Sequence, residues 1–124
     1  MSTFHAVVWM DQAEAHVLMF DNEHVHGERV HSHSKHNHQG KPPDNKAFYT
    51  EIVQALEGSH EVLLTGAGTA RTEFKTWCDT HAKACAHTII ENLPSDHPTN
   101  PQLIALARKY FVKFDKMAGD PRLL

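Results

Sequence analysis

The apolar residues of this chain change their spacing near residue 45, and this change limits the folds that the chain can adopt. Before it, segments 4–10 and 15–20 have the two-residue period of short strands. After it, the apolar residues of segment 46–56 recur every three or four positions, as on the buried face of a helix. The chain is therefore expected to combine a sheet with helices in one α/β domain.

The first part of the chain predicts three antiparallel strands joined by tight turns. The expected strands are 4–10, 15–20 and 23–31. Asp11-Gln12 and Asp21-Asn22 separate them and are typical turn residues. The third strand is the most polar, with Val25 and Val30 as its apolar positions, and we expect Gly27 to interrupt it as a bulge.

Helices and strands alternate in the rest of the chain. The expected order is helix 46–56, strand 61–64, helix 70–83, strand 88–90 and helix 100–111, the last capped by Thr99. A three-stranded meander that continues into two strand–helix crossovers gives a mixed five-stranded sheet with helices packed on it. This is the element order of ribonuclease-H-like folds. We expect one α/β domain over residues 1–112 and a charged tail over 113–124.

Several aromatic and histidine side chains are expected in the core of this domain. They are Trp9, His16, Trp77, His81, Tyr110 and Phe111. Cys78 and Cys85 are seven positions apart in one expected helix and its end, a rise of roughly 10 Å that is too long for a disulfide. Their reduced state predicts a cytoplasmic protein.

Bulk composition describes an ordinary globular chain. Its 124 residues are 40% hydrophobic and 22% charged, with a formal net charge of −3 when the histidines are neutral. This charge argues against binding nucleic acid with the whole surface, although a local basic patch remains compatible with it. The chain has no secretion signal at its start and no run of about 18 apolar residues, so no membrane partner is expected.

Six of the 12 histidines lie between residues 24 and 38, and the segment around them, about 31–45, is an expected His-rich loop. His-x-His pairs occur at 24/26, 31/33 and 36/38, and the two rings of such a pair can reach one metal ion from an extended chain. His31, His33, His36 and His38 are the candidate ligands, and zinc and nickel are the candidate metals.

Two other interpretations of the His-rich loop stay open. Lys35, Gln39 and Lys41, together with partly charged histidines, are able to contact RNA or phosphate. Alternatively, the loop is solvated and its histidines only adjust the local charge.

A glycine-containing turn, Gly66-Ala67-Gly68-Thr69, leads from an expected strand into an expected helix. Its backbone N–H groups are able to hold a phosphate at the positive end of the helix, with Arg71 beside it. The turn matches neither a Walker loop nor a dinucleotide fingerprint. A tight strand-to-helix connection explains the same residues without a ligand.

Catalytic chemistry has little support in the sequence. A two-metal nuclease of ribonuclease-H type needs converging carboxylates, but the fourth expected strand ends without one and leaves Asp11, Glu51 and Asp96 as isolated candidates. His97 beside Asp96 suggests a proton shuttle, which keeps a small hydrolase as an alternative. No activated nucleophile accompanies it.

Several motifs match a known family and together extend over roughly residues 4–111. They are Val8-Trp9-Met10-Asp11, Ala13-Glu14-Ala15, the His-rich loop, residues 63–75, Asp96-His97-Pro98-Thr99, Gln102-Leu103 and residues 107–111. With these motifs the chain resembles the middle domain of the archaeal and eukaryotic class I peptide-chain release factor and of its relative Pelota. It especially resembles the short stand-alone bacterial proteins related to them.

This resemblance implies descent from the translation machinery. In the release factor, the loop between the third strand and the first helix carries a Gly-Gly-Gln tripeptide that enters the peptidyl-transferase centre. Here the same place holds His36-Asn37-His38-Gln39-Gly40-Lys41, without the paired glycines that allow close backbone approach. We therefore expect no peptidyl-tRNA hydrolysis.

The leading hypothesis is a small non-enzymatic protein related to the translation machinery that contacts the ribosome or RNA through the His-rich loop. Its candidate contacts are Lys35, His38, Gln39, Gly40, Lys41, Gly66, Gly68 and Arg71. The first alternative is a protein that binds zinc or nickel, and the second is a small hydrolase.

Overall fold

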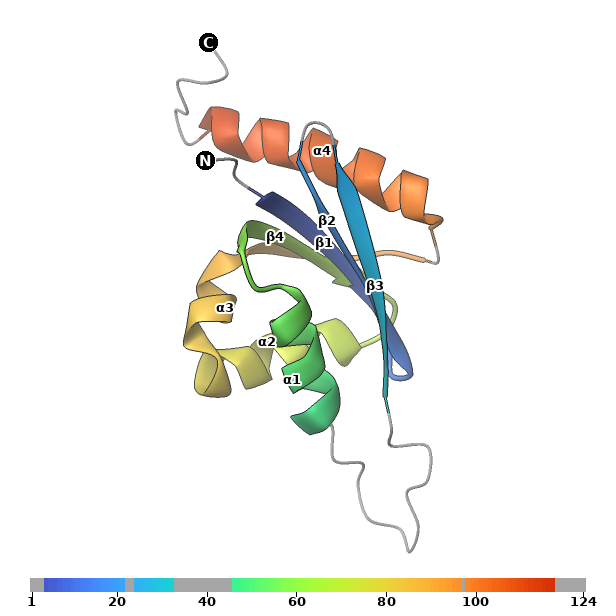
Figure 1. The fold of residues 1–124 in the computed structure, drawn as a ribbon, viewed down its shortest axis with the longest axis vertical. Coiled ribbons are helices and arrows are strands. Elements are labelled where there is room, and N and C mark those ends of the chain that lie inside the picture. The colour runs from blue at the N-terminus through green and yellow to red at the C-terminus, as the bar shows by residue number, and fades with distance from the viewer. Residues whose placement is uncertain (1–3, 22–23, 33–45, 97, 118–124) are drawn as a thin grey trace, which may run out of the picture.

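The computed structural model describes residues 4–21, 24–32, 46–96 and 98–117, and these form one sheet with helices on both of its faces (Figure 1). The strands are β1 (Phe4–Met10), β2 (Glu14–Phe20), β3 (Val25–His31), β4 (Ser59–Gly66) and β5 (Ile89–Pro94). The helices are α1 (Lys46–Ala55), α2 (Ala70–His81), α3 (Lys83–Thr88) and α4 (Asn100–Met117). Helix α4 covers one face of the sheet, and α1, α2 and α3 cover the other.

The expected mixed five-stranded sheet is confirmed. Its strand order is β3-β2-β1-β4-β5. Strand β2 is antiparallel to both β1 and β3, which is the expected meander, whereas β4 is parallel to β1 and to β5. The sheet thus begins as a meander and continues through two crossovers, as the change of period predicted.

The expected bulge at Gly27 is wrong. Strand β3 pairs with β2 in unbroken register, and Gly27 lies opposite Leu18. A Cβ atom at Gly27 would lie 3.0 Å from Cδ2 of Leu18. The glycine therefore makes room for a neighbouring leucine within a regular strand, rather than adding an unpaired residue.

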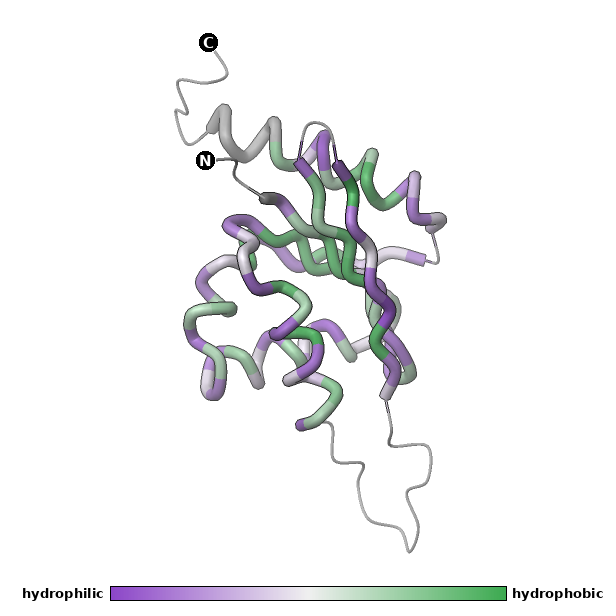
Figure 2. The backbone as a smooth tube through the Cα atoms, viewed as in Figure 1, coloured by the Kyte–Doolittle hydropathy of each residue, from purple (hydrophilic) through white to green (hydrophobic). Residues whose placement is uncertain are grey.

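Strand β1 lies in the middle of the sheet and separates two layers of core. Ala6, Val8 and Met10 point toward α1 and α2, where they pack with Ile52 and Phe74. The alternate side chains contact α4 in a second cluster, whose members include Val7, Trp9, Leu103 and Phe111. Figure 2 shows hydrophobic residues concentrated along the central strands. Burial on both faces explains why β1 is apolar at nearly every position.

Several element boundaries differ from those expected. Strand β4 begins two residues earlier and ends two residues later, and β5 continues through Pro94. Helix α4 continues through Met117, so the expected tail at 113–124 begins too early. The first glycine after Thr99 is Gly119, and the sequence from 112 to 117 therefore contains no residue that ends a helix.

The expected single helix over 70–83 is two helices. Helix α2 ends at His81, Ala82 has φ −145° and ψ 62°, and α3 starts at Lys83. Neither glycine nor proline is present at this break, which explains why the sequence pattern does not reveal it. Cys78 and Cys85 therefore lie on different helices, and both pack against the same apolar cluster. The single continuous helix from which their separation was expected is therefore wrong.

Among the helices of the described ranges, none combines the length and apolar character needed to cross a membrane.

Candidate functional site

The expected His-rich loop falls almost entirely outside the described residues. Its candidate metal ligands His33, His36 and His38 lie there, and so do the candidate RNA contacts Lys35, Gln39, Gly40 and Lys41. His31 is described, and it is exposed at the end of β3. The next described element after it is α1, so segment 33–45 connects β3 to α1.

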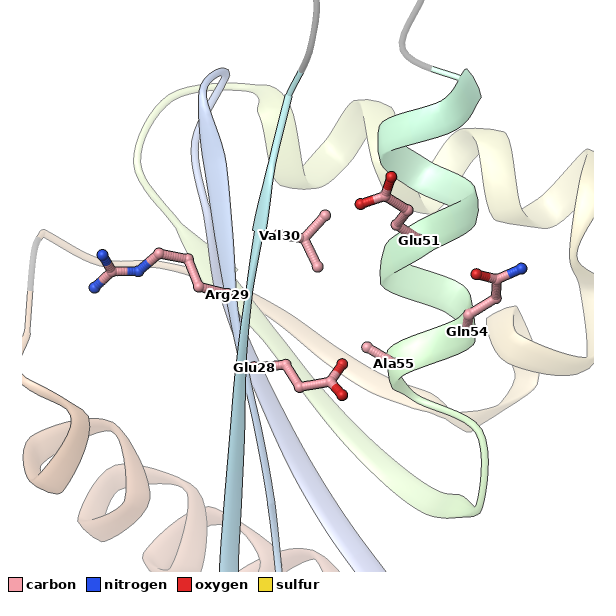
Figure 3. A pocket seen from close by; sticks show the side chains of 6 residues that line it. All are labelled: Glu28, Arg29, Val30, Glu51, Gln54 and Ala55. Atoms are coloured by element: carbon pink, nitrogen blue, oxygen red, sulfur yellow. The ribbon is translucent and has the colours of Figure 1, made fainter.

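A groove lies between β3 and α1, the same two elements that segment 33–45 connects (Figure 3). Its volume is about 480 Å³, and its walls are Glu28, Arg29 and Val30 of β3 together with Glu51, Gln54 and Ala55 of α1. The carboxylates of Glu28 and Glu51 lie on the groove side of their elements, whereas the Arg29 side chain extends away from α1. Two carboxylates repel phosphate, and this groove is therefore a poor place for a nucleic-acid backbone.

The glycine-containing turn lies where β4 ends and α2 begins. Gly66 has φ +154°, and a Cβ atom there would lie 2.0 Å from the backbone oxygen of Met10. Only glycine permits this approach of β4 to β1, so the fold itself requires Gly66. Gly68 has φ +69°, and a Cβ atom there would have no other atom within 4 Å, which leaves space beside it.

Arg71, in the first turn of α2, is held against the end of β5. Its Nη1 donates a hydrogen bond of 2.5 Å to Oδ1 of Asn92, while its Nε is buried and has no hydrogen-bond partner within the described residues. Thr69, the residue before α2, makes no side-chain capping hydrogen bond to the first turn. The turn therefore offers backbone N–H groups and a nearby guanidinium, the groups that bind anions at helix starts.

The carboxyl ends of the parallel strands β1, β4 and β5 meet at this edge of the sheet. The hydroxyl of Thr65 donates to Oγ of Ser95 over 2.8 Å, and the indole Nε1 of Trp9 donates to the backbone oxygen of Asp96 over 2.5 Å. Open α/β sheets bind ligands outside the carboxyl ends of their strands. Gly66, Gly68 and Arg71 all lie at this edge.

The candidate carboxylates of a nuclease do not converge. Oδ1 of Asp11 accepts hydrogen bonds from the backbone N–H groups of Ala13 and Glu14 at 2.8 and 2.9 Å, which makes it the expected turn residue. Glu51 is on α1, and Asp96 follows β5. Among the described residues, no three histidine, cysteine or acidic side chains gather as a metal site would require. His97, the candidate proton shuttle, lies outside these residues.

Of the two histidines expected in the core, neither is fully buried. His16 is half-buried, with Nε2 2.6 Å from Oε1 of Glu14 and its ring against the edge of Trp9. His81 is exposed, and its ring lies 5.1 Å from the ring of Trp77. His81 is exposed because α2 ends there. Of the expected core aromatics, Trp9 and Phe111 are buried, whereas Trp77 and Tyr110 are half-buried.

Sequence reasoning missed two side chains that join α4 to the sheet. Arg108 of α4 donates to the backbone oxygen of Asp21 over 3.1 Å. His5 stacks on Phe111 at 4.5 Å between ring centroids, and its Nε2 lies 2.7 Å from Oε1 of Glu61. Only the pairing of distant elements creates these contacts, and no local pattern signals them.

No protein-family model matches this chain, and no curated protein matches it. Solved structures do resemble it. Pelota of Thermoplasma acidophilum superposes with a TM-score of 0.62 at 22% identity, and Pelota of Archaeoglobus fulgidus with 0.69 at 14% identity. Each match covers 99% of this chain and 35% of the other. The archaeal translation termination factor aRF1 superposes with a TM-score of 0.55 at 10% identity. This match covers 95% of the present chain and 42% of the aRF1 chain.

These similarities define the class of fold. It is a mixed five-stranded α/β unit of the release-factor middle-domain type, as the sequence predicted. The structures that share it include Pelota and aRF1, and this chain spans only about a third to two fifths of their length, 35% and 42% respectively.

Proposed function

We propose that this chain is a translation-related binding module that contacts the ribosome or RNA and does not hydrolyse peptidyl-tRNA. The observation that carries the proposal is the fold, which the chain shares over 99% of its length with Pelota. A fourth similar structure, Dom34 of S. cerevisiae, is described as a translation termination-like factor involved in RNA quality control, with a TM-score of 0.53 at 11% identity.

The proposed RNA contact consists of the His-rich loop and the edge of the sheet at Gly66, Gly68 and Arg71. The loop contributes Lys35, His38, Gln39, Gly40 and Lys41. The free space beside Gly68 and the unpartnered Nε of Arg71 support the second part.

Sedimentation with ribosomes tests the proposal. The chain is centrifuged with purified ribosomes at increasing salt, and we expect association at low salt that weakens as salt rises, because bound cations displace counterions from phosphate. The double substitution Lys35→Ala and Lys41→Ala should weaken it about tenfold or more. Lys109→Ala is the matched control, because it removes one exposed cation from α4 and should leave association nearly unchanged.

Arg71→Lys tests the sheet edge separately. It keeps the positive charge but loses the planar fork that contacts both Asn92 and an anion. Reduced ribosome association by this variant, with an unchanged unfolding midpoint, would assign the edge to RNA. Absence of association at low salt in the unsubstituted chain would refute the proposed function.

The proposed lack of hydrolysis has its own assay. Ribosomes that carry peptidyl-tRNA are incubated with the chain, and we expect no release of peptide above the rate without it. The physical reason is the absence of paired glycines around Gln39, where His38 and Asn37 would obstruct close approach to the ester bond. Release at a rate that Gln39→Ala abolishes would contradict this part.

Metal binding by the His-rich loop is the second candidate function. His31 is exposed at the end of β3 and is the first of the four candidate ligands, which are His31, His33, His36 and His38. Dialysis against zinc or nickel followed by elemental analysis should find one ion per chain, lost when all four are changed to alanine. His24 and His26 provide the control, because each already lies against a neighbouring carboxylate, at 3.4 and 3.5 Å.

A further inference from the structure

Strand β3 forms one edge of the sheet, and among the described residues no strand pairs with its outer side. Six of its seven residues are exposed, and Val25 keeps 51% of its surface in solvent. The strand contains no proline, and its pairing with β2 contains no bulge. Proline and bulges are two devices by which proteins close a sheet edge, so β3 is open to pairing with a further strand.

The register of β3 against β2 shows which of its backbone groups point outward. At one end of the ladder the N–H of Asp21 donates to the backbone oxygen of His24. At the other end the N–H of Ser32 donates to the backbone oxygen of Ala13. Hydrogen-bonded pairs alternate along an antiparallel ladder, and this register is unbroken. Residues 25, 27, 29 and 31 therefore direct their N–H and C=O groups away from β2.

The groove beside this edge is acidic. Side chains at the even positions of β3 face α1, where Val30 joins the apolar cluster and Glu28 lines the groove. The carboxylates of Glu28 and Glu51 lie on the groove side, whereas the Arg29 side chain extends away from it (Figure 3). Nε2 of His26 lies 3.5 Å from Oε1 of Glu28, and this imidazole adds a positive charge only when it is protonated. The groove therefore attracts cationic side chains.

We propose that the open edge of β3 binds an extended, lysine- or arginine-rich segment of another protein, which adds antiparallel to β3 as a sixth strand. The outward residues of β3 supply backbone hydrogen bonds, and alternate side chains of the added strand reach Glu28 and Glu51 in the groove. The backbone pairing provides affinity, and the carboxylates select basic side chains. This surface shares no residue with the proposed RNA contact, and its occupation requires no ribosome.

The pleat of the added strand sets its expected sequence pattern. The residue opposite Glu28 has its side chain on the same face, with Cβ atoms roughly 5 Å apart, and a lysine there pairs with the carboxylate. The residue opposite Arg29 lies on the other face, where a second cation would be repelled. Basic residues should therefore alternate with uncharged ones. A second copy of this chain fits poorly, because full overlap of two antiparallel β3 strands sets Glu28 against Glu28.

A short peptide with this pattern tests the pairing. The peptide Thr-Lys-Val-Lys-Val-Lys-Thr, capped at both ends and fluorescently labelled, is titrated with the full chain while its anisotropy is measured. We expect saturable binding with a Kd below about 1 mM. N-methylation of the two valines, whose N–H groups face β3 in the antiparallel pairing, should weaken binding at least about tenfold. N-methylation of two lysines, whose N–H groups face solvent, should weaken it less than about threefold.

The two modified peptides have the same charge, so they separate strand pairing from simple electrostatic attraction. Equal effects of the two modifications, or a larger loss from the modified lysines, would overturn the proposal. Absence of saturable binding by the unmodified peptide would overturn it as well.

Two pairs of variants assign the surface on the chain itself. Arg29→Pro removes an outward N–H without removing a bond to β2 and should weaken binding at least about tenfold, whereas Arg29→Ala keeps that N–H and should not weaken it. Glu28→Lys turns an attraction into a repulsion and should weaken binding about tenfold. Glu73→Lys, at an exposed carboxylate of α2, is the charge-matched control and should change binding less than about twofold. If Arg29→Pro does not fold, the N-methylated peptides still decide, and equal effects at 28 and 73 would overturn the proposal.

Amide hydrogen exchange distinguishes other occupants of the edge. In the free chain the N–H groups of Gly27 and Arg29 should exchange quickly and those of Glu28 and Val30 slowly, because only the even positions bond to β2. Saturating peptide should slow exchange at Gly27 and Arg29 at least about tenfold. Slow exchange at these two residues without peptide would mean that another segment of this chain covers the edge. Protection that appears only as the chain is concentrated would assign the edge to a second copy, and either result would overturn the proposal.

Discussion

The guanidinium carbon of Arg108 lies 5.0 Å from the centroid of the Phe20 ring, and Nη2 of Arg108 donates to the backbone oxygen of Asp21 over 3.1 Å. One side chain of α4 thereby joins a cation–π contact and a hydrogen bond at the end of β2. Removing both should destabilise the chain, and we expect Arg108→Ala to lower the free energy of unfolding by about 1–2 kcal/mol in urea denaturation.

Arg108→Lys and Lys109→Ala distinguish the causes of that loss. Arg108→Lys keeps a cation over Phe20 but removes the planar guanidinium donor. It should therefore lower the free energy of unfolding by about half as much as Arg108→Ala does. Lys109 is exposed on the same helix, and its removal should change stability by less than about 0.5 kcal/mol. If Arg108→Ala and Lys109→Ala lower the stability equally, the loss comes from the change in helix charge and not from the contact of Arg108 with Phe20 and Asp21.

Tyr110 and Glu91 link α4 to β5 and predict a dependence of stability on pH. The phenol of Tyr110 donates to Oε2 of Glu91 over 2.8 Å. The backbone N–H of Asn92 and then this phenol lower the pKa of Glu91 below its ordinary value of 4.5. Because the folded-state pKa is the lower one, the stabilisation is complete above pH 4.5 and is lost as pH falls through the lowered value.

Tyr110→Phe should therefore lower the free energy of unfolding by about 1 kcal/mol at neutral pH. The difference in stability between this variant and the unsubstituted chain should become smaller below pH 4.5. Urea denaturation between pH 3 and 7 measures it, at roughly one-unit intervals. In a Glu91→Gln background the effect of Tyr110→Phe should not vary with pH over this range. A difference that stays constant in the Glu91 chain would exclude the carboxylate as its cause.

Thr99 and Gln102 form a reciprocal cap at the start of α4. The amide oxygen of Gln102 accepts from the backbone N–H of Thr99 at 2.8 Å, and the Thr99 hydroxyl accepts from the backbone N–H of Gln102 at 3.3 Å. Thr99→Ala should lower the free energy of unfolding by about 1 kcal/mol, and Thr99→Ser should retain most of it. Thermal unfolding followed by circular dichroism compares them. If serine is no better than alanine, the hydroxyl does not act as a cap.

The elements that the sequence predicted best are those whose evidence is local. The cap at Thr99 rests on residues three apart, and the order of strands and helices rests on hydrophobic period. The turn role of Asp11 is local as well, since its carboxylate accepts from residues 13 and 14. In each case the residues that make the interaction are near neighbours in the chain, and residue type and spacing were enough to predict it.

The features that the sequence did not predict depend on tertiary contacts. The break at Ala82 has no glycine or proline, and the position of Arg108 over Phe20 joins residues 88 apart in the chain. The acidic groove arises only because α1 packs beside β3. For the candidate site, the sequence identified Gly66, Gly68 and Arg71 as neighbours, but it did not reveal that Asn92 already holds the guanidinium.

Gly66 and Gly68 belong to one turn, and the structure predicts opposite outcomes for the same substitution at the two positions. Alanine at 66 would place Cβ 2.0 Å from the backbone oxygen of Met10, and the close pairing of β4 with β1 offers no flexible side chain to move. We expect Gly66→Ala to unfold the chain or to cost more than about 4 kcal/mol. At Gly68 the surrounding space is open, and alanine should cost only about 1 kcal/mol for its left-handed backbone. Urea denaturation compares the two, and a folded, fully stable Gly66→Ala chain would show that β4 does not approach β1 as described. Because Gly68→Ala is expected to fold, its sedimentation with ribosomes tests whether a phosphate binds in the space beside this residue.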